Sequence, residues 1–309
     1  MRLDCPMPHP QTRRPRLMAA LVLSCGCPLV SALTVASPTS RAVFEPSPNQ
    51  RGMMAAAHAA FESAVELTTH ARNGGGGLSA EVPRLLRDAF NADFECSLAS
   101  VKHVQNVTCK RPDDNVCGAQ CFDDSLLTLP LQDGRACHGG DCSCACSRIE
   151  LPAFATPEEA ICFRNCVDSL MPSEHEHPHH NLYLMSCAAA GDVRATLTFI
   201  RLIERMRRVI AHEYGLNLAR VVPRQAFVSR ISGSAERQMV HADESSHDTF
   251  HYSSVLYLSS QGVDFHGGTF SFSDPPADAR GERVLRSVVP STGSAVAFSS
   301  GWENIHFGA

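Results

Sequence analysis

The stretch VHADESSHDTFHYSSVLYLSS, residues 240–260, joins a polar turn to an apolar run rich in strand-forming residues. His241 and Asp243 stand one residue apart just before this run. An imidazole and a carboxylate at this spacing can bind one metal ion. Because histidine is plentiful in this chain, however, a single His-x-Asp triplet is expected by chance. The triplet therefore needs support from the rest of the sequence.

The sequence around this stretch alternates with the period of a β-strand. Short β-prone runs are separated by Gly, Pro, Ser and Asp clusters, as strands are by turns. The runs are QAFVSRI (225–231), HYSSVLYLS (251–259), GGTFSF (267–272), RVLRSVVP (283–290) and GSAVAFSS (293–300). Several antiparallel strands at this spacing predict a β-sandwich or barrel.

A long amphipathic helix is expected before the strands, over residues 193–214. Asp192 is placed to cap it, and Gly215 to end it. Its expected apolar stripe is Leu197, Ile200, Ile203, Met206 and Ile210. Its expected water-facing residues are Arg201, Glu204, Arg205 and Arg208, with Glu204 placed to pair with Arg208. A helix lying across a sheet makes the expected class α+β.

A second histidine, His306, follows the last strand run in SSGWENIHFGA, residues 299–309. With His241 and Asp243 it supplies two imidazoles and one carboxylate. That set forms the facial triad of non-haem iron oxygenases, which leaves positions on Fe(II) open for a bidentate co-substrate and for O₂. Zinc at the same three ligands is the alternative, because it too binds His and Asp.

The ordered set FVSRI…HADE…HYSSVLYLS…DFHGGTFSF…VVPSTGSAVAFSSGWENIHFG resembles the catalytic domain of the prolyl 4-hydroxylase-like 2-oxoglutarate and iron-dependent oxygenases. It is most similar to the secretory-pathway group named for a 2-oxoglutarate and iron-dependent oxygenase domain. The resemblance covers residues 193–309, over a third of the chain. Its strength lies in five elements in order: His-x-Asp, Tyr-Leu-Ser, Gly-Gly, Pro-x-x-Gly and Glu-Asn-x-His.

The resemblance implies a double-stranded β-helix, or jelly roll, over residues 191–309, with His241, Asp243 and His306 as iron ligands. It implies that Tyr257 binds 2-oxoglutarate and that Gly267 and Gly268 let a neighbouring strand turn close to the site. The implied cofactors are Fe(II), 2-oxoglutarate and, as a candidate, ascorbate. The implied reaction consumes O₂, yields succinate and CO₂, and hydroxylates a prolyl or lysyl side chain of a protein or peptide.

This sequence departs from the family pattern in two places. The family carries a basic residue about ten positions after the distal histidine, which anchors the far carboxylate of 2-oxoglutarate, whereas this sequence ends at Ala309. The last, central strand is then expected to be missing, which would expose its neighbours and leave this form inactive. The second departure is Ile231, which stands near the position where prolyl hydroxylases often carry a second tyrosine for the co-substrate. The competing hypothesis is a non-catalytic, disulfide-rich binding protein on a jelly roll that has lost co-substrate binding.

The N-terminus has the pattern of a targeting segment. Arg2, Arg13, Arg14 and Arg16 precede the apolar segment 17–36, which predicts a signal peptide or an uncleaved membrane anchor. A Pro- and Ser-rich linker is expected over 37–54. The expected location is the secretory pathway, in the lumen or membrane of the endoplasmic reticulum. The glycosylation sequon at Asn106 fits this compartment.

Residues 55–190 are expected to form a cysteine-rich, partly helical region. Of the fourteen cysteines, Cys5, Cys25 and Cys27 lie in the targeting segment, and most others lie between residues 96 and 187. In a secreted chain this density predicts disulfides, with zinc clusters as the alternative. Helices are expected over 55–71 and from a capping box at 156–159. That second helix places Cys162 and Cys166 on one face, each expected to bond elsewhere.

Other polar features are expected to be structural or solvated. The formal net charge is −5 and no basic stripe is present, which argues against nucleic-acid binding. The histidine-rich run SEHEHPHHN, residues 173–181, is expected to be a solvated loop. His247 and His251 are expected to be structural or solvent-facing, because the triad is complete without them.

Overall fold

The computed structural model describes residues 18–22, 47–105, 148–172, 179–231, 240–245, 250–274 and 284–308. Its helices are α1 (Pro48–Arg72), α2 (Val82–Leu98), α3 (Pro157–Asp168), α4 (Leu184–Ala190) and α5 (Val193–Glu213), with short 3₁₀ turns η2 (Leu218–Arg220), η3 (Asp243–Ser245) and η4 (Trp302–Asn304). Its strands are β1 (Met18–Val22), β2 (Lys102–Gln105), β3 (Arg148–Leu151), β4 (His179–Tyr183), β5 (Phe227–Ile231), β6 (Tyr252–Tyr257), β7 (Phe270–Asp274), β8 (Val284–Val288), β9 (Ala295–Ser299) and β10 (His306–Gly308).

The described strands form two antiparallel sheets. The first has the order β2-β3-β9-β6-β1-β5-β4, and the second has the order β10-β7-β8. Each of the five strand runs expected after residue 215 forms a strand, from β5 to β9. The α+β class is therefore confirmed, and the jelly-roll assignment stays a prediction.

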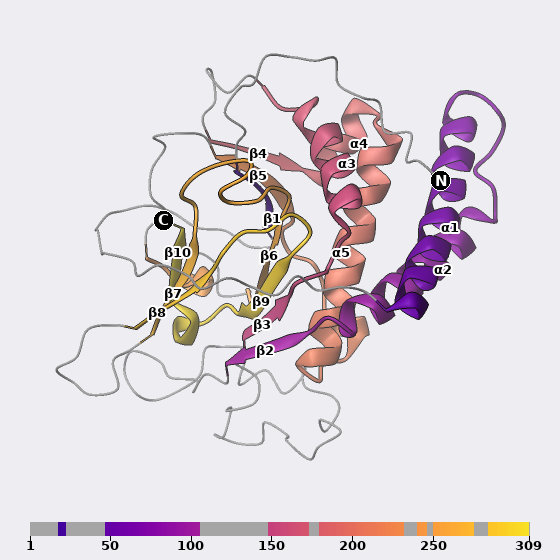
Figure 1. The fold of residues 1–309 in the computed structure, drawn as a ribbon. Coiled ribbons are helices and arrows are strands. Elements are labelled where there is room, and N and C mark those ends of the chain that lie inside the picture. Colours follow the sequence, from indigo (N-terminus) through magenta and orange to yellow (C-terminus); the bar gives the residue numbers. More distant parts are fainter. Residues whose placement is uncertain are drawn as a thin grey trace.

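Side chains of the large sheet alternate between two cores. On β6, Val255 and Tyr257 pack with Phe272 of the small sheet, whereas Leu256 and Leu258 pack with the helices. Strand period two sends neighbouring residues to opposite faces, so one strand serves both cores. Figure 1 shows the resulting layers, with the small sheet on one side of the large sheet and α3, α4 and α5 on the other.

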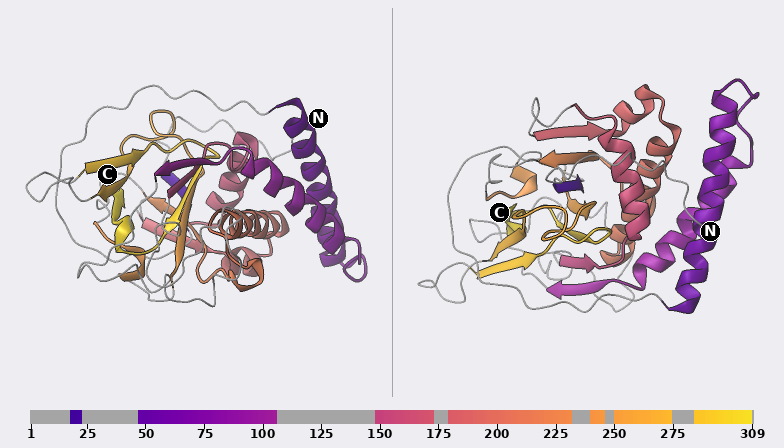
Figure 2. Two further views of the ribbon diagram at one scale, coloured as in Figure 1. Left: turned by 90° about the horizontal axis from the view of Figure 1, so that it is seen from below. Right: turned by 45° about the horizontal axis from the view of Figure 1, so that its top comes forward.

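The hairpin of α1 and α2 covers the far side of α5, as both views in Figure 2 show. Phe61 and Val65 of α1 pack with Ala89 of α2, and Leu197 of α5 lies against them. Helix α5 is therefore covered on two sides, by the sheet core and by the hairpin.

This second neighbour makes the expected solvent face of α5 wrong. Arg201 and Arg205 are buried, with 4% and 3% of their surface exposed. They bind the buried carboxylate of Asp93 on α2, at 2.6 Å from Arg201 Nε and 2.9 Å from Arg205 Nη2. Arg205 Nη2 also binds Glu159 of α3 at 2.8 Å. Buried guanidinium groups need such partners, and the partners lie far away in sequence.

The rest of α5 follows the sequence. Its bounds match the expected helix, Asp192 accepts a hydrogen bond from the Ala195 amide, and Gly215 follows with a φ of +66°. The expected pair of Glu204 and Arg208 is present at 2.7 Å. The N-terminal cap of α3 is also confirmed, because Thr156 Oγ1 accepts from the Glu159 amide at 3.1 Å.

Several elements were not expected. Helix α1 begins at Pro48 rather than at residue 55, with Ser47 and Gln50 forming a reciprocal cap inside the expected linker 37–54. Helix α2 and strands β2, β3 and β4 lie within the region 55–190, where neither this helix nor any strand was predicted. Strand β3 pairs with β9, and β4 pairs with β5, so both sides of the expected boundary at residue 190 share one sheet.

Strand β1 lies inside the large sheet, between β6 and β5. Met18–Val22 is the described part of the apolar segment 17–36, and it pairs antiparallel with both β5 and β6. The prediction that a last strand is missing stays a prediction. Within the described residues, no helix has the length and hydropathy needed to cross a bilayer. The signal or anchor assignment stays a prediction.

The described cysteines include two buried thiols, Cys96 and Cys187, and a partly buried one, Cys166. Cys162 is disulfide-bonded, whereas Cys96, Cys166 and Cys187 are free. The expectation that Cys166 bonds elsewhere is therefore wrong. Burial raises the pKa of the Cys166 and Cys187 thiols to about 11, so both stay protonated near neutral pH. The sequon at Asn106 and the cysteines between residues 109 and 146 lie outside the described residues.

We expect Asp93→Asn to lower the free energy of unfolding by about 3–5 kcal/mol, because it leaves buried guanidinium groups without their carboxylate. Asp88→Asn is the matched control on the same helix. Its partner Arg84 lies at 3.2 Å and both side chains are more than half exposed, so its loss should stay below about 1 kcal/mol. Urea unfolding at pH 7 measures the free energy of unfolding of both variants. Equal losses would contradict the assignment of Asp93 as the essential partner of the buried guanidinium groups.

The same pair predicts a pH dependence. Burial works to raise the pKa of Asp93, but the charges of Arg205 and Arg201 bring it below its usual value. A carboxyl group with a lowered folded-state pKa stabilises the fold above its unfolded pKa of about 4, and loses this contribution as the pH falls further. The difference in stability between the wild type and Asp93→Asn should therefore narrow below about pH 4. A constant difference from pH 7 to 3 would argue against it.

Candidate metal centre

Two backbone hydrogen bonds bring the sequence-predicted ligands together. His241 and His306 form an isolated antiparallel bridge, in which each amide donates to the carbonyl of the other, at 3.0 and 2.9 Å. Because side chains opposite each other on a ladder point to the same face, the two imidazoles lie side by side, with ring centroids 4.5 Å apart. Asp243 follows in η3, and Ser245 caps the turn by donating to the Ala242 carbonyl.

The three donor groups have the separations that a metal ion requires. Asp243 Oδ1 lies 3.3 Å from His241 Nε2 and 3.6 Å from His306 Nε2. One donor atom from each residue lies within 4.8 Å of the other two. Ligands at about 2.1 Å from one metal are separated by roughly 3.0 Å in octahedral and roughly 3.4 Å in tetrahedral geometry. The spacing therefore fits a metal, and it fits iron and zinc alike.

His306 is held in the tautomer that a metal ligand needs. Its Nδ1 lies 2.8 Å from the carbonyl oxygen of Asn304. A carbonyl oxygen can only accept, so Nδ1 carries the hydrogen and Nε2 keeps its lone pair directed at Asp243. Burial lowers the pKa of His306, against the opposing effect of Asp243, and this favours the neutral, metal-binding imidazole.

Three aromatic rings pack against the imidazole of His306. Phe270 stacks on the imidazole with centroids 4.9 Å apart, Phe298 lies edge-on at 4.9 Å, and Phe272 lies at 6.1 Å. These residues come from β7 and β9, which pack against each other inside the sandwich. These rings were not predicted as part of the site, although the alternating aromatic residues of GGTFSF were a usable signal. They make the inner wall of the site apolar.

Access to the site lies on the side of His241. The side chain of His241 is 15% exposed, against 4% for Asp243 and 5% for His306. A ligand that approached the three donors would therefore meet the imidazole of His241 first.

Tyr257 lies in the same core as these rings. It is fully buried at the end of β6, packed with Phe270 and Phe298. Its backbone is fixed by Gly293, whose amide donates to the Tyr257 carbonyl at 2.8 Å. Gly293 ends the Pro-x-x-Gly turn with a φ of +85°, and a Cβ there would lie 2.3 Å from the Ala155 carbonyl oxygen. The turn therefore requires glycine.

Among the described residues, the other candidates do not belong to the group of possible metal ligands. Gly267 and Gly268 both adopt positive φ in the loop before β7. His251 lies just before β6, where its carbonyl accepts from the Ser300 amide. His247 and residues 173–178 of the histidine-rich run lie outside the described residues, and His179 and His180 belong to β4. Within the described residues, His241, Asp243 and His306 are the group able to hold a metal.

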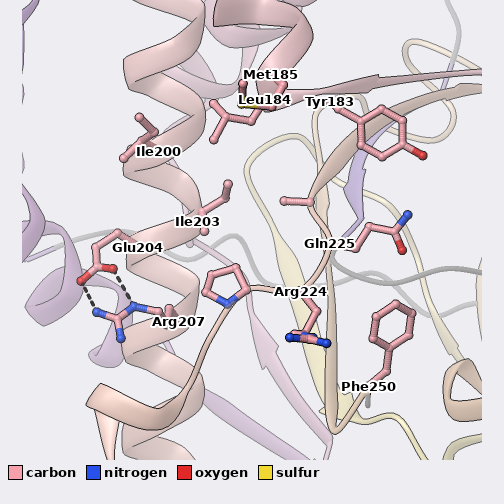
Figure 3. A pocket seen from close by; sticks show the side chains of 12 residues that line it. Tyr183, Leu184, Met185, Ile200, Ile203, Glu204, Arg207, Arg224, Gln225 and Phe250 are labelled. Carbon is pink, nitrogen blue, oxygen red and sulfur yellow. Dashed lines mark hydrogen bonds and ion pairs between the residues drawn. The ribbon is translucent and has the colours of Figure 1, made fainter. Parts of the chain in front are cut away.

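A cavity of about 900 Å³ lies elsewhere, between α5 and the ends of β4 and β5. Figure 3 shows Ile200 and Ile203 of α5 on one wall and Arg224 and Phe250 on the other. None of the three candidate ligands lines it. Ile200 and Ile203 of the expected apolar stripe of α5 thus line this cavity, and Ile203 also packs against the core between α5 and the sheet.

Comparison with known proteins finds relatives that match part of the chain. No family model matches the chain. Over 109 residues it is 31% identical to 2-oxoglutarate and iron-dependent oxygenase domain-containing protein 3 of Xenopus tropicalis, and over 110 residues it is 30% identical to the Homo sapiens protein of that name. Each match covers 33% of this chain and 32% of the relative. The chain thus spans about a third of the length of these relatives, whose name specifies iron and 2-oxoglutarate.

We expect the wild-type chain to bind one Co(II) ion, whose visible absorption reports on its ligands. Asp243→Ala or His306→Ala should weaken Co(II) binding by more than ~100-fold, the upper effect of losing a residue that only hydrogen-bonds to a metal ligand. His266→Ala is the control, because His266 is an exposed imidazole in the nearby β6–β7 loop. Anaerobic titration followed by visible absorption gives the affinities. Unchanged binding by Asp243→Ala, or loss of binding by His266→Ala, would contradict the assignment.

Proposed function

We propose that the chain is an Fe(II)- and 2-oxoglutarate-dependent dioxygenase built on a jelly roll. The observation that carries the proposal is the convergence of His241, Asp243 and His306 on one point, with both histidines joined by a backbone bridge. The names of the relatives support iron over zinc for these ligands. When bound, iron with 2-oxoglutarate and O₂ supplies the oxidising chemistry, which yields succinate and CO₂ and hydroxylates a C–H bond.

The residues of this chain would hold and shield that chemistry. His306 keeps Nε2 available because Asn304 holds its Nδ1 hydrogen. The Phe270 and Phe298 rings exclude water from the buried side of the site. Tyr257 is proposed to take part in binding 2-oxoglutarate, because its side chain lies in the same core as these rings.

The substrate proposed is a prolyl or lysyl side chain in a protein of the secretory pathway, with ascorbate as co-reductant. Family resemblance supports the substrate class. The apolar segment 17–36 and the cysteine content support the location in the endoplasmic reticulum. The competing proposal is a disulfide-rich binding protein that retains the metal but not the co-substrate.

Turnover of 2-oxoglutarate tests the function directly. We expect the full chain, given Fe(II), ascorbate and O₂, to form succinate slowly alone and faster with prolyl or lysyl peptides. The rate of succinate formation should be more than about 100-fold lower in Asp243→Ala, because this variant lacks a metal ligand rather than a residue that hydrogen-bonds to a ligand. His266→Ala should keep wild-type turnover. Metal binding with no succinate under any of these conditions would reject the enzyme and leave the binding protein.

A further inference from the structure

A buried guanidinium group lies between the two sheets, next to the candidate metal centre. Arg148 on β3 is 1% exposed. Its Nη1 and Nη2 donate to the two carboxylate oxygens of Asp274 on β7, at 3.1 and 2.6 Å. Its Cζ lies 4.0 Å from the centroid of the Phe272 ring. Arg148 therefore spans from the large sheet to the small sheet through the core of the sandwich.

The same guanidinium group holds the turn that precedes His306. Nε donates to Asn304 Oδ1 at 2.6 Å, and Nη2 donates to the carbonyl oxygen of Glu303 at 3.2 Å. The amide group of Asn304 is fixed from the other side, because Nδ2 donates to the carbonyl and hydroxyl oxygens of Ser299 at 3.0 and 2.8 Å. The backbone carbonyl of Asn304 accepts the Nδ1 hydrogen of His306. Arg148 is thus two hydrogen bonds away from a candidate metal ligand.

The hydrogen bonds of the Arg148 side chain indicate that it orients neighbouring residues rather than binding a ligand. Four hydrogen bonds, to Asp274, Asn304 and Glu303, occupy most of the five N–H groups of the side chain. Little capacity remains to bind a co-substrate carboxylate, so Arg148 does not replace the basic anchor of the related oxygenases. Stability alone is a weak reason to bury an ion pair, because apolar side chains of similar volume often serve as well. What the ion pair adds here is a fixed position for η4.

We propose that Arg148 is a positioning residue for the metal ligand His306, acting through Asn304 and held in place by Asp274. The proposal rests on the proposed metal site. It assigns a role at the centre to a residue 158 positions before the ligand that it orients, from a strand outside the region that resembles the oxygenases.

The experiment compares two buried arginines. Arg148→Met removes the positioning contacts. Arg201→Met is the matched control, because Arg201 is also buried, binds both oxygens of Asp93 at 2.6 and 2.8 Å and lies over the Phe61 ring, yet it belongs to the helical layer. We expect Arg148→Met to weaken Co(II) binding about 10- to 100-fold, the usual effect of an outer partner of a metal ligand, and to change the absorption bands. Arg201→Met should leave affinity and bands unchanged.

A second readout does not need the metal. In wild-type protein labelled with ¹⁵N-histidine, His306 should show a single Nδ1–H tautomer, and Arg148→Met should show a mixture. If Arg148→Met does not fold, Asp274→Asn replaces it; this variant keeps Arg148 in place without its charged partner, and should give the same changes to a smaller degree.

Wild-type Co(II) affinity in a folded Arg148→Met or Asp274→Asn protein, with an unchanged tautomer, would overturn the proposal. So would an equal loss in Arg201→Met, because that loss would reflect global destabilisation. Failure of the proposed function looks different: the wild type would bind Co(II) without forming succinate, and the arginine comparison would still be readable.

Discussion

The candidate site depends on the backbone bridge between His241 and His306. These residues stand 65 positions apart, and closing a flexible loop of that length costs about 4 kcal/mol plus a constant. The paired strands around the bridge, and not the imidazoles, meet this cost. β10 pairs with β7, and β7 with β8, so the bridge joins His241 to the free edge of a strand that the small sheet already holds in place. The donor groups are therefore brought together by the fold before any metal arrives.

Burial around the bridge serves the site in a second way. The rings of Phe270, Phe272 and Phe298 belong to the core between the sheets, so the packing that joins the sheets also surrounds His306. An apolar wall favours the neutral imidazole, and it keeps water from the side of the site opposite His241. Polar contacts at Asn304 and Ser299 then fix orientation within that wall. Packing supplies the environment, and a few hydrogen bonds supply direction.

The parts of this structure that follow a local pattern could be predicted from the sequence. Strands β5 to β9 have clear alternation, and the caps at Asp192 and Thr156 need only neighbouring residues. The ligands could be found because His-x-Asp and the distal histidine are short motifs in a fixed order. Contacts between distant residues could not be found in this way. In the sequence alone, Arg201 and Arg205 have the pattern of surface residues. They are buried because α2 places Asp93 beside them, and Asp93 lies 108 positions before Arg201.

The same limit explains the missed strands and Arg148. Strand β3 has four residues and no sustained alternation, and its place is set by pairing with β9 rather than by its own pattern. The role proposed for Arg148 depends on its hydrogen bonds to Asp274, 126 positions later, and to Asn304, 156 positions later. A lone arginine in a short run carries no such information. Sequence reasoning therefore reached the ligands but not the partner proposed to orient them.

The segment Met18–Val22 has two roles assigned to it, one as a strand inside the large sheet and one as part of a targeting segment. Strands β5 and β6 both pair antiparallel with β1 and so run parallel to each other, and both are buried along most of their length. Their backbone groups need a strand between them, because unpaired groups at a buried sheet centre are costly. Met18–Val22 meets this need here, yet the same residues lie in the segment proposed to direct or anchor the chain. A segment that is removed or inserted in a membrane cannot also pair with β5 and β6. Targeting and sheet closure are thus alternative uses of these residues, and any form lacking them needs another apolar strand at this position to keep the sheet that supports the metal centre.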